Sequence, residues 1–234
     1  MAATTAAHRT ANGAATAMPQ ETLNGHEVRS QRSTRALTRA AGELIAENGY
    51  QAMTLAMVGE RAGYSRSLAT ARFGSKAKLL EALVDEIAVR WSLEKIEPEA
   101  EALPGIQGLH TLLTGIQDSY RKTPHSLLVL YALLFEALGP VPELRERFVT
   151  FHRRMRAGIA ATIRRGILDG SIRSDVDADE QATAIVAQLR GVAYLWKLDP
   201  ETTDPARTLS LFLDQCMSHL AVNPRKGRFR EVGR

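Results

Sequence analysis

The chain of 234 residues has a mass of 25.6 kDa and is 44% hydrophobic and 24% charged, so it can form a sizeable core and is not broadly disordered. No run approaches the roughly 18 apolar residues that cross a bilayer, and the N-terminus lacks the apolar stretch of a secretory signal. A single cysteine, Cys216, excludes an intrachain disulfide and a multi-cysteine zinc site. We therefore expect a soluble, cytoplasmic protein with no membrane partner.

The formal net charge of +4 is unevenly distributed along the chain. Residues 26–78 hold nine basic and four acidic side chains, a sum of +5, whereas residues 79–223 hold 15 and 20, a sum of −5. The last eleven residues, 224–234, hold five basic and one acidic side chain, a sum of +4. A basic segment joined to an acidic body is expected where only the first part meets a polyanion, although imbalances of this size also arise by chance.

The first part of the chain predicts a disordered arm followed by a helix. Residues 1–25 are rich in Ala and Thr and hold almost no large apolar side chains, so we expect them to be disordered. From Ser33 onward, apolar residues recur at every third or fourth position through Ile45, which indicates one apolar helix face. The pair Asn48-Gly49 is typical of a helix end.

Three further helices are each preceded by a residue suited to cap them. These caps and the helices that they precede are Thr54 for 55–62, Ser65 for 66–73 and Ser75 for a helix from 76 onward. The first two helices are short, and the turn between them contains Gly63. Two short helices joined by a tight turn with glycine form a helix-turn-helix unit.

The rest of the chain is helical in pattern, and no segment has the period of a strand. The expected helices cover 106–120, 124–138, 142–168, 178–197 and 205–221. The sequence therefore predicts an all-α fold, with an N-terminal helix-turn-helix domain and a C-terminal helical domain. The predicted parts are a disordered arm at 1–25, the helix-turn-helix domain at 26–78, the helical domain at 79–223 and a basic tail at 224–234.

Basic residues stand where helix starts favour acidic ones. The predicted helix starts carry Arg66 in one case and Lys76 and Lys78 in the other. Cations there are unfavourable by about 0.3–1 kcal/mol each unless an external anion is supplied. A DNA phosphate would supply that anion, although for Lys78 simple solvation is an equally sufficient explanation.

The outer face of the predicted 66–73 helix is small, polar and basic. Its side chains are Arg66, Ser67, Thr70 and Arg72. A thin face of this kind can enter the major groove, where arginine pairs with guanine and Ser or Thr contacts several base edges. The pattern therefore favours sequence-specific DNA binding over a general basic patch.

Residues 33–84 resemble the DNA-binding domain of the TetR/AcrR family. The resemblance rests on Gly49 with its following aromatic residue, on Thr54, on the turn Glu60-Arg61-Ala62-Gly63 with Ser65, and on Phe73-Gly74-Ser75-Lys76 followed by Leu79-Leu80. Later in the chain, Gly170 and the stretch Asp175-Val176-Asp177 are similar to the family's approach to its penultimate helix. The resemblance implies a ligand-responsive, sequence-specific transcriptional regulator that acts as a repressor and needs no cofactor. It also implies that residues 26–78 form the DNA-binding domain and residues 79–223 the effector-binding and dimerisation domain.

The resemblance also implies roles for individual residues at a double-stranded DNA operator. Thr54 and Lys76 are expected to hold phosphates, while Arg66, Ser67 and Thr70 face bases. The family usually has an aromatic pair where Thr70 and Arg72 stand, and a small residue where Ser67 stands. Either Arg72 replaces the lost aromatic contact electrostatically or Tyr64 packs differently at the turn.

Two apolar stripes on the last two helices are candidates for a homodimer interface. The resemblance implies that this helix pair forms a four-helix bundle with a second copy. From the residues alone, plain packing within one chain is the alternative. The residues are Ile185, Leu189 and Trp196 on the first helix and Leu209, Phe212, Leu213 and Met217 on the second.

The middle helices hold candidates for a small-molecule effector site, for which core packing is the alternative. Apolar and aromatic walls with a few polar groups are typical of such a site. His152 is the favoured polar contact and Glu136 the second. The candidate lining residues are Leu112, Ile116, Tyr120, Leu127, Tyr131, Phe135, His152, Met155 and Gln188.

The sequence offers little for the rival classes. Its six histidines lack metal-ligand spacing, and it has no H-E-x-x-H, G-x-S-x-G, P-loop or G-x-G-x-x-G motif, so we predict neither an enzyme nor a metal site. A nonspecific architectural DNA-binding protein and a helical small-molecule carrier stay open as alternatives. Neither the effector nor the operator follows from the sequence.

Overall fold

The computed structural model describes residues 25–92, 100–139 and 142–222. Over these ranges the chain is helical, with one isolated bridge between Ile172 and Ala221 and no strand. The all-α prediction is therefore confirmed. The arm predicted before residue 25 and the basic tail predicted at 224–234 lie outside the described residues.

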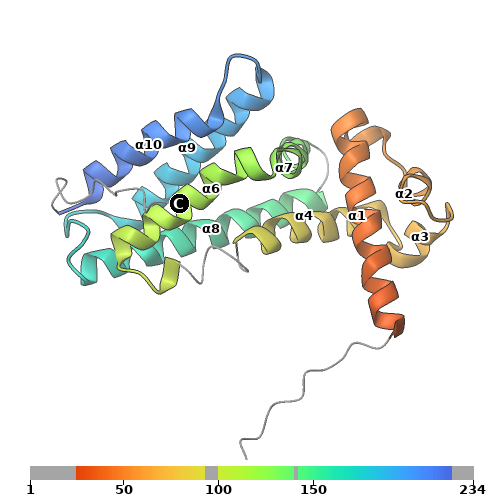
Figure 1. Ribbon diagram of the computed structural model, residues 1–234, viewed down its shortest axis with the longest axis horizontal. Coiled ribbons are helices and arrows are strands. Elements are labelled where there is room, and N and C mark those ends of the chain that lie inside the picture. The colour runs from red at the N-terminus through yellow and green to blue at the C-terminus, as the bar shows by residue number, and fades with distance from the viewer. Residues whose placement is uncertain (1–24, 93–99, 140–141, 223–234) are drawn as a thin grey trace, which may run out of the picture.

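The helices form a small head and a larger body (Figure 1). The head consists of α1 (Gly25–Ala52), α2 (Leu55–Arg61) and α3 (Leu68–Phe73). The body consists of α4 (Lys76–Ser92), α6 (Gly105–Lys122), α7 (Pro124–Glu136), α8 (Pro142–Leu168), α9 (Ala178–Leu198) and α10 (Pro205–Leu220). In Figure 1, α1 stands across one end of the body, while α9 and α10 run together at its far side.

Several predicted caps and turns have the expected geometry. The Thr54 hydroxyl accepts a hydrogen bond from the Met57 N–H at 3.2 Å, and the Ser75 hydroxyl accepts one from the Lys78 N–H at 3.2 Å. Gly63, in the turn between α2 and α3, has a φ of 78°, which side chains rarely adopt. These local signals depend on a few neighbouring residues, and the sequence predicts them correctly.

Two helix starts differ from the prediction. The prediction began the first helix at Ser33 because residues 25–32 carry no apolar stripe. In the structure these residues are helical, and α1 begins at Gly25. α3 begins at Leu68 and not at Arg66, with Ser67 as its N-cap residue in place of Ser65. The Ser65 carbonyl accepts from the Leu68 N–H at 3.1 Å, so Arg66 lies in the turn before the helix.

Close packing of the backbone explains this later start of α3. A side-chain carbon added to Gly59 of α2 would lie 2.4 Å from the Ser65 carbonyl oxygen. The Gly59 carbonyl in turn accepts from the Tyr64 N–H at 2.9 Å. Glycine at residue 59 therefore lets the turn lie directly against α2, and the turn uses the residues that the sequence had assigned to the helix.

The apolar side chains form two cores that meet along α7. The head core joins α1, α2 and α3 to Leu79 and Leu80 of α4 and to Phe148 of α8. The body core joins α6, α8, α9 and α10. Helix α7 contributes to both, because Leu133 packs in the head core and Tyr131 in the body core. The predicted domain limit at residue 78 thus falls at the start of a helix whose first turns complete the head core.

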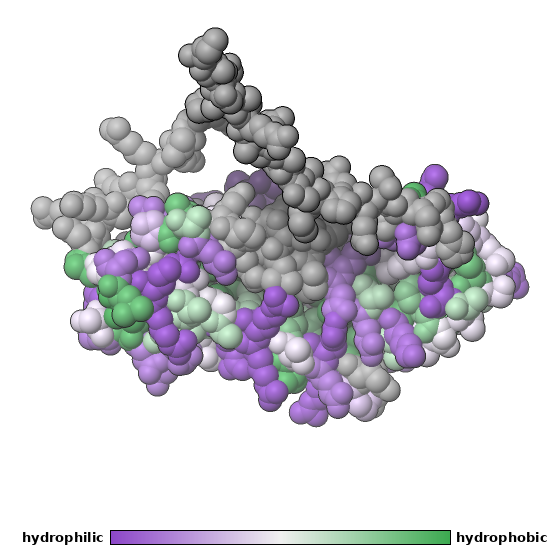
Figure 2. All heavy atoms as spheres, turned by 90° about the horizontal axis from the view of Figure 1, so that it is seen from below, coloured by the Kyte–Doolittle hydropathy of each residue, from purple (hydrophilic) through white to green (hydrophobic). Residues whose placement is uncertain are grey.

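The outer surface is mainly polar. The face in Figure 2 is largely hydrophilic, with hydrophobic residues in small separate groups. Within the described residues no helix is both long and apolar enough to cross a membrane. Cys216, the one cysteine of the sequence, is buried in the body core, and burial raises the pKa of its thiol to about 11.

Candidate DNA-binding edge and effector cluster

An exposed polar edge runs along α2 and α3. Thr54 caps α2, Arg66 lies in the turn, Ser67 caps α3 and Thr70 lies one turn into α3. All four are exposed, and we call them the polar edge. Beneath them, Ala69 is fully buried and Phe73 packs against the head core, so α3 turns its apolar side inward.

Arg66 is held only by a surface ion pair. Its Nε atom pairs with the Glu60 carboxylate of α2, and its side chain is 76% exposed. Exposed pairs of this kind are worth about 0–1 kcal/mol, so little free energy opposes its transfer to another acceptor. The Ser67 hydroxyl lies 3.3 Å from that of Ser65, and it makes no cap hydrogen bond within α3.

Arg72 contacts α1. One terminal nitrogen donates to the Ser30 hydroxyl at 2.5 Å and the other to the Ser33 hydroxyl at 3.0 Å. Both serines belong to α1, about forty positions earlier in the sequence. Arg72 therefore links α3 to α1 while the residue itself stays exposed.

Lys76 also has partners within the chain. Its ammonium group lies 4.1 Å from the centre of the Tyr50 ring and donates to the Gln51 carbonyl at 3.2 Å. Partial burial lowers the pKa of Lys76, and the charge of Glu136 opposes that shift. The cation at the start of α4 is thus stabilised internally, so its position alone does not require a phosphate.

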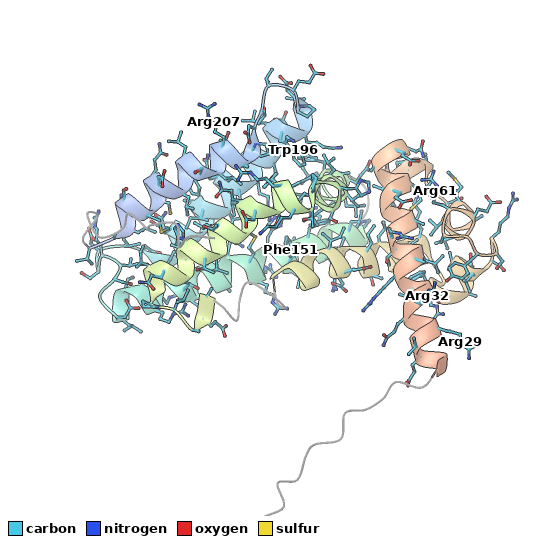
Figure 3. The ribbon with its side chains drawn as sticks, viewed as in Figure 1. Arg29, Arg32, Arg61, Phe151, Trp196 and Arg207 are labelled. Carbon is cyan, nitrogen blue, oxygen red and sulfur yellow. The ribbon has the colours of Figure 1, made fainter. Side chains whose placement is uncertain are left out.

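The early start of α1 adds basic side chains to the head. Arg29 and Arg32 are exposed on the turns of α1 that precede Ser33, and Figure 3 shows them at the free end of that helix. The prediction included Arg32 among the early turns of this helix but missed Arg29, because it began the helix at Ser33. The signal available in the sequence was the absence of Gly or Pro between residues 26 and 41.

Within the body, polar atoms from two helices, α7 and α8, converge on Arg190 of α9. Its terminal nitrogen NH1 donates to the Tyr131 hydroxyl of α7 at 2.9 Å, and its Nε donates to His152 Nε2 of α8 at 2.9 Å. Its other terminal nitrogen lies 3.2 Å from the Met155 sulfur, and the Tyr131 hydroxyl lies 3.1 Å from that of Tyr120. We call these five residues the Arg190 cluster.

Aromatic rings surround the cluster. The guanidinium carbon lies 5.4 Å from the centre of the Tyr131 ring and 5.7 Å from that of Phe151. Trp196 packs edge-on to Tyr120 at 5.2 Å. Figure 3 shows Phe151 and Trp196 inside the body, whereas Arg207 points away from α10 into solvent. The site is therefore aromatic, with one cation at its centre.

The hydrogen bonds fix the protonation of His152. Arginine can only donate, so His152 Nε2 accepts, and the ring proton lies on Nδ1, which donates to the Phe148 carbonyl at 2.9 Å. Burial, and then the charge of Arg190, lower the pKa of His152 to about 4. Burial also raises the pKa of Tyr120 well above its ordinary value. At neutral pH the partners of Arg190 within the described residues are all uncharged.

The predicted effector residues are brought together in part. Tyr120, Tyr131, His152 and Met155 belong to the cluster, while Leu127, Ile116 and Phe135 pack in or against the same core. Leu112 is half-buried on α6. Gln188 is exposed and does not reach the cluster, because α9 turns the neighbouring Leu189 inward. The charge of Glu136 acts on Lys76 at the start of α4 and not on the cluster.

Arg190 was absent from the sequence prediction. It lies one helical turn after Val186 and one before Ala193, both of which are buried. A cation on an otherwise apolar helix face was the signal that could have identified it. Among the described residues, no group of His, Cys, Asp and Glu is arranged to hold a metal ion.

The residues predicted for dimerisation are largely internal. Ile185, Leu189, Leu209, Leu213 and Met217 are buried within the single chain, and Trp196 and Phe212 pack against the same core. Packing within one chain therefore accounts for the five buried residues, whereas Trp196 and Phe212 keep part of their surface exposed. Other residues form the outward surface of the helix pair: Ala184, Ala187, Gly191, Tyr194, Leu195 and Leu198 on α9, and Leu211 on α10.

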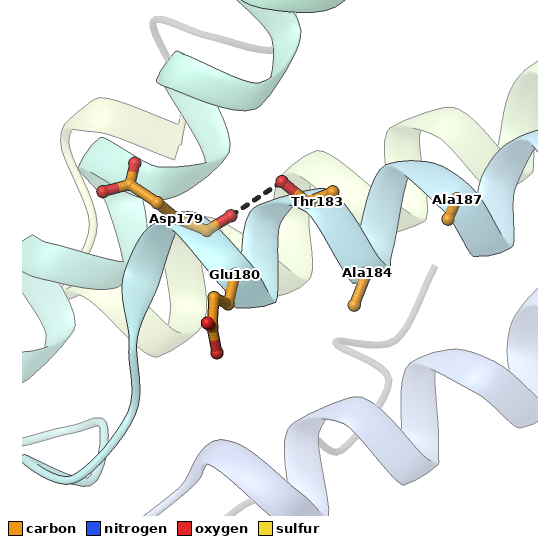
Figure 4. Close-up of a pocket in the computed structure, with 5 residues that line it drawn as sticks. All are labelled: Asp179, Glu180, Thr183, Ala184 and Ala187. Atoms are coloured by element: carbon orange, nitrogen blue, oxygen red, sulfur yellow. Dashed lines mark hydrogen bonds between the residues drawn. The ribbon is translucent and has the colours of Figure 1, made fainter.

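A shallow groove follows the first turns of α9. Asp179, Glu180, Thr183, Ala184 and Ala187 line it (Figure 4). The Thr183 hydroxyl donates to the Asp179 carbonyl at 2.9 Å and so is satisfied within the helix. The lining thus combines two alanines with the side chains of Asp179, Glu180 and Thr183.

Two family models match the chain. "Bacterial regulatory proteins, tetR family" covers residues 37–83, and "BetI-type transcriptional repressor, C-terminal" covers residues 106–221. The HTH-type transcriptional regulator TtgR of Pseudomonas putida is 22% identical over 202 residues, which span 83% of this chain and 94% of TtgR. These matches define a helix-turn-helix transcriptional regulator. The chain belongs to the TetR family.

Solved structures share this fold. SmeT, the repressor of the Stenotrophomonas maltophilia multidrug efflux pump SmeDEF, aligns with a TM-score of 0.70 at 21% identity, over 83% of this chain and 93% of SmeT. A transcriptional regulator from Saccharomonospora viridis in complex with choline also has a TM-score of 0.70 at 21% identity, over 82% of this chain and 100% of that one. At such identities the likeness supports the fold.

Proposed function

We propose that this TetR-family regulator is a homodimeric repressor that a small, largely apolar effector releases from its DNA operator. The observation that carries the proposal is the double role of α7. Tyr131 of α7 binds Arg190 in the effector cluster, whereas Leu130 and Leu133 of the same helix pack in the head core. A ligand that moves Tyr131 therefore acts on a helix that also supports the head.

The polar edge is the DNA-reading part of this proposal. Arg66, Ser67 and Thr70 face base edges in the major groove, and Thr54 and Lys76 contact phosphates. The weak surface pair with Glu60 leaves Arg66 able to exchange that carboxylate for a guanine. Arg72 fixes the angle of α3 through α1 and is not itself a base contact.

The outward surface of α9 and α10 is the dimer interface of the proposal. One small helix-turn-helix unit buries too little surface for a specific operator, so two copies are needed at half-sites one helical turn or a multiple of it apart. Leu198 is 68% exposed and Leu211 60% exposed, although both are large and apolar. On α9, a side-chain carbon added to Gly191 would meet no atom within 4 Å, and this open space permits close approach of another helix.

Operator selection from genomic DNA, followed by gel shifts against random duplex, tests the reading role. We expect the selected site to bind at least about 10³-fold more tightly than random DNA. Arg66→Ala should relax base preference at one position of the half-site. Lys76→Ala should weaken every duplex alike and reduce the salt slope by about one.

The matched control for these variants is Arg154→Ala, because Arg154 is exposed on α8. It should leave base preference and the salt slope unchanged. Equal affinity for selected and random DNA would favour the nonspecific architectural alternative. Sedimentation as a monomer at micromolar concentration would contradict the dimer.

A further inference from the structure

Arg190 carries a charge for which the described residues provide no opposite charge. The side chain is half-buried, and each of its hydrogen-bond partners, Tyr131, His152 and Met155, is neutral. Arg61, Arg66, Arg147, Arg164 and Arg173 each pair with a carboxylate, whereas Arg72 and Arg165, like Arg190, donate to neutral oxygen acceptors. Arg190 therefore has two aromatic rings near its charge and no carboxylate partner among the described residues.

A buried charge is costly unless it is paired and hydrogen-bonded. The rings of Tyr131 and Phe151 offset part of that cost through cation–π attraction. Neutral oxygen, nitrogen and sulfur acceptors are weaker partners for a guanidinium than a carboxylate, whose two oxygens match its paired N–H groups. The three hydrogen bonds of Arg190 therefore satisfy its N–H groups, but a carboxylate could replace these neutral acceptors.

Among the described residues, the groups around Arg190 are either positively charged or neutral. His152 feels the positive charges of both Arg190 and Arg156, and both lower its pKa. The hydroxyls of Tyr120 and Tyr131 can donate as well as accept. A ligand in contact with the cluster would therefore meet one cation, two hydroxyl donors and aromatic walls, and no carboxylate from the described residues.

We propose that the effector is a small organic acid with an apolar body, whose carboxylate binds the Arg190 guanidinium and accepts from the tyrosine hydroxyls. The inference rests on the proposed effector role of this cluster and specifies the chemical class of its ligand. The apolar body packs on Phe151 and Trp196. A quaternary ammonium such as choline, which the Saccharomonospora viridis regulator binds, would be repelled by Arg190.

Binding of the acid also changes the contacts of α7. When the carboxylate takes the N–H groups of Arg190, Tyr131 exchanges its contact with the guanidinium for one to the anion. Because Leu130 and Leu133 lie beside Tyr131 on α7 and pack in the head core, the change at the cluster reaches the support of α1. The ligand charge thus supplies the difference in affinity between two states that an effector requires.

Calorimetry and thermal unfolding of the unsubstituted full chain, without DNA, test the ligand class. The probes are octanoate and 4-phenylbutyrate, with the matched neutral alcohols 1-octanol and 4-phenyl-1-butanol, and choline. We expect at least one acid to bind about tenfold or more tightly than its alcohol and to raise the Tm, with no binding of choline. An alcohol or choline that binds as tightly as the acids overturns the proposal, as does the absence of saturable binding by either acid at millimolar concentration.

Arg190→Gln then tests the residue, because glutamine keeps a polar group and removes the charge. We expect it to abolish the preference for acid over alcohol, while Arg154→Gln, on the exposed side of α8, retains it. Equal acid preference in Arg190→Gln overturns the assignment. If that variant does not fold, the comparison of acid with alcohol in the unsubstituted chain decides.

The outcome is separable from the function proposed above. Acid binding that persists without any effect on operator affinity would contradict the release of a repressor and leave the ligand class intact. If a neutral or cationic ligand releases the protein from its operator, the proposed ligand class is contradicted and the proposed repressor function is retained.

Discussion

The head and the body use arginine in opposite ways. In the head, Arg66 lies on the surface beside a carboxylate, and Arg72 donates to two serine hydroxyls of α1. In the body, Arg190 lies among aromatic rings with neutral partners. A surface cation can be released from its partner at little cost, whereas an interior cation keeps a strong preference for an anion.

The comparison shows which contacts of each site are already formed before DNA or a ligand binds. The polar edge is exposed and weakly paired, so its specificity depends on how rigidly α2 and α3 hold it. The Arg190 cluster is already hydrogen-bonded, so a ligand must compete with existing contacts. The apolar packing of α7 is what connects the two. Four changes can separate the regions or show that they are coupled.

The largest effect is expected where the regions meet. Leu133 of α7 is fully buried in the head core, so Leu133→Ala should lower the free energy of unfolding by about 2–5 kcal/mol. Urea unfolding measures the loss. Leu138, at 83% exposure, is the control, and Leu138→Ala should change stability by less than about 0.5 kcal/mol. Similar losses in both variants would contradict the shared packing of α7.

The next effect should be confined to the head. Gly59→Ala places a carbon against the Ser65 carbonyl, which must move, so we expect a loss of about 1–3 kcal/mol and weaker operator binding. Gly158→Ala on α8 meets no atom and should stabilise the chain by up to about 1 kcal/mol. Unchanged DNA affinity in Gly59→Ala would show that the turn is not what orients the polar edge.

The third effect belongs to the body and depends on pH. The pKa of His152 falls from an ordinary 6.5 to about 4 on folding, so between these values the unfolded chain binds a proton that the folded chain does not. The free energy of unfolding should therefore fall as pH falls from 6.5 to 4, by about 1–2 kcal/mol after partial exposure is discounted.

His152→Gln should flatten that acid dependence, because glutamine offers Arg190 an acceptor and does not titrate. His125→Gln is the control, since His125 is exposed at the start of α7. Urea unfolding at several pH values makes the measurement. An equally steep acid dependence in His152→Gln would assign it to other groups.

The smallest effect on stability is expected at the polar edge. Arg66→Gln removes only an exposed pair with Glu60, so the free energy of unfolding should change by less than about 0.5 kcal/mol. A larger change would mean that Arg66 supports the turn, and the contrast between the two uses of arginine would weaken. Thermal unfolding compared with that of Arg154→Gln is sufficient.

The sequence predicted features that depend on near neighbours. Apolar spacing identified the long helices, and Thr54 and Ser75 cap as their positions suggested. It failed where contacts between distant segments decide. The start of α3 depends on how Gly59 meets Ser65, and the role of Arg72 depends on serines of α1.

The Arg190 cluster was only half predictable for the same reason. Its tyrosines, His152 and Met155 lie on apolar faces and were candidates, but the cation that unites them comes from another helix. Periodicity shows that both α9 and α10 have an apolar stripe. It does not say whether the stripe meets its own chain or a second copy, and burial within the chain decides that question.

The buried thiol makes the body core observable without any added label. With one cysteine in the sequence, buried and with its pKa raised to about 11, a thiol reagent at neutral pH reacts only during excursions that expose α10. The rate of modification at Cys216 therefore reports how often α10 becomes exposed. A ligand that tightens the body would slow that chemistry, which gives an effector search a readout independent of DNA.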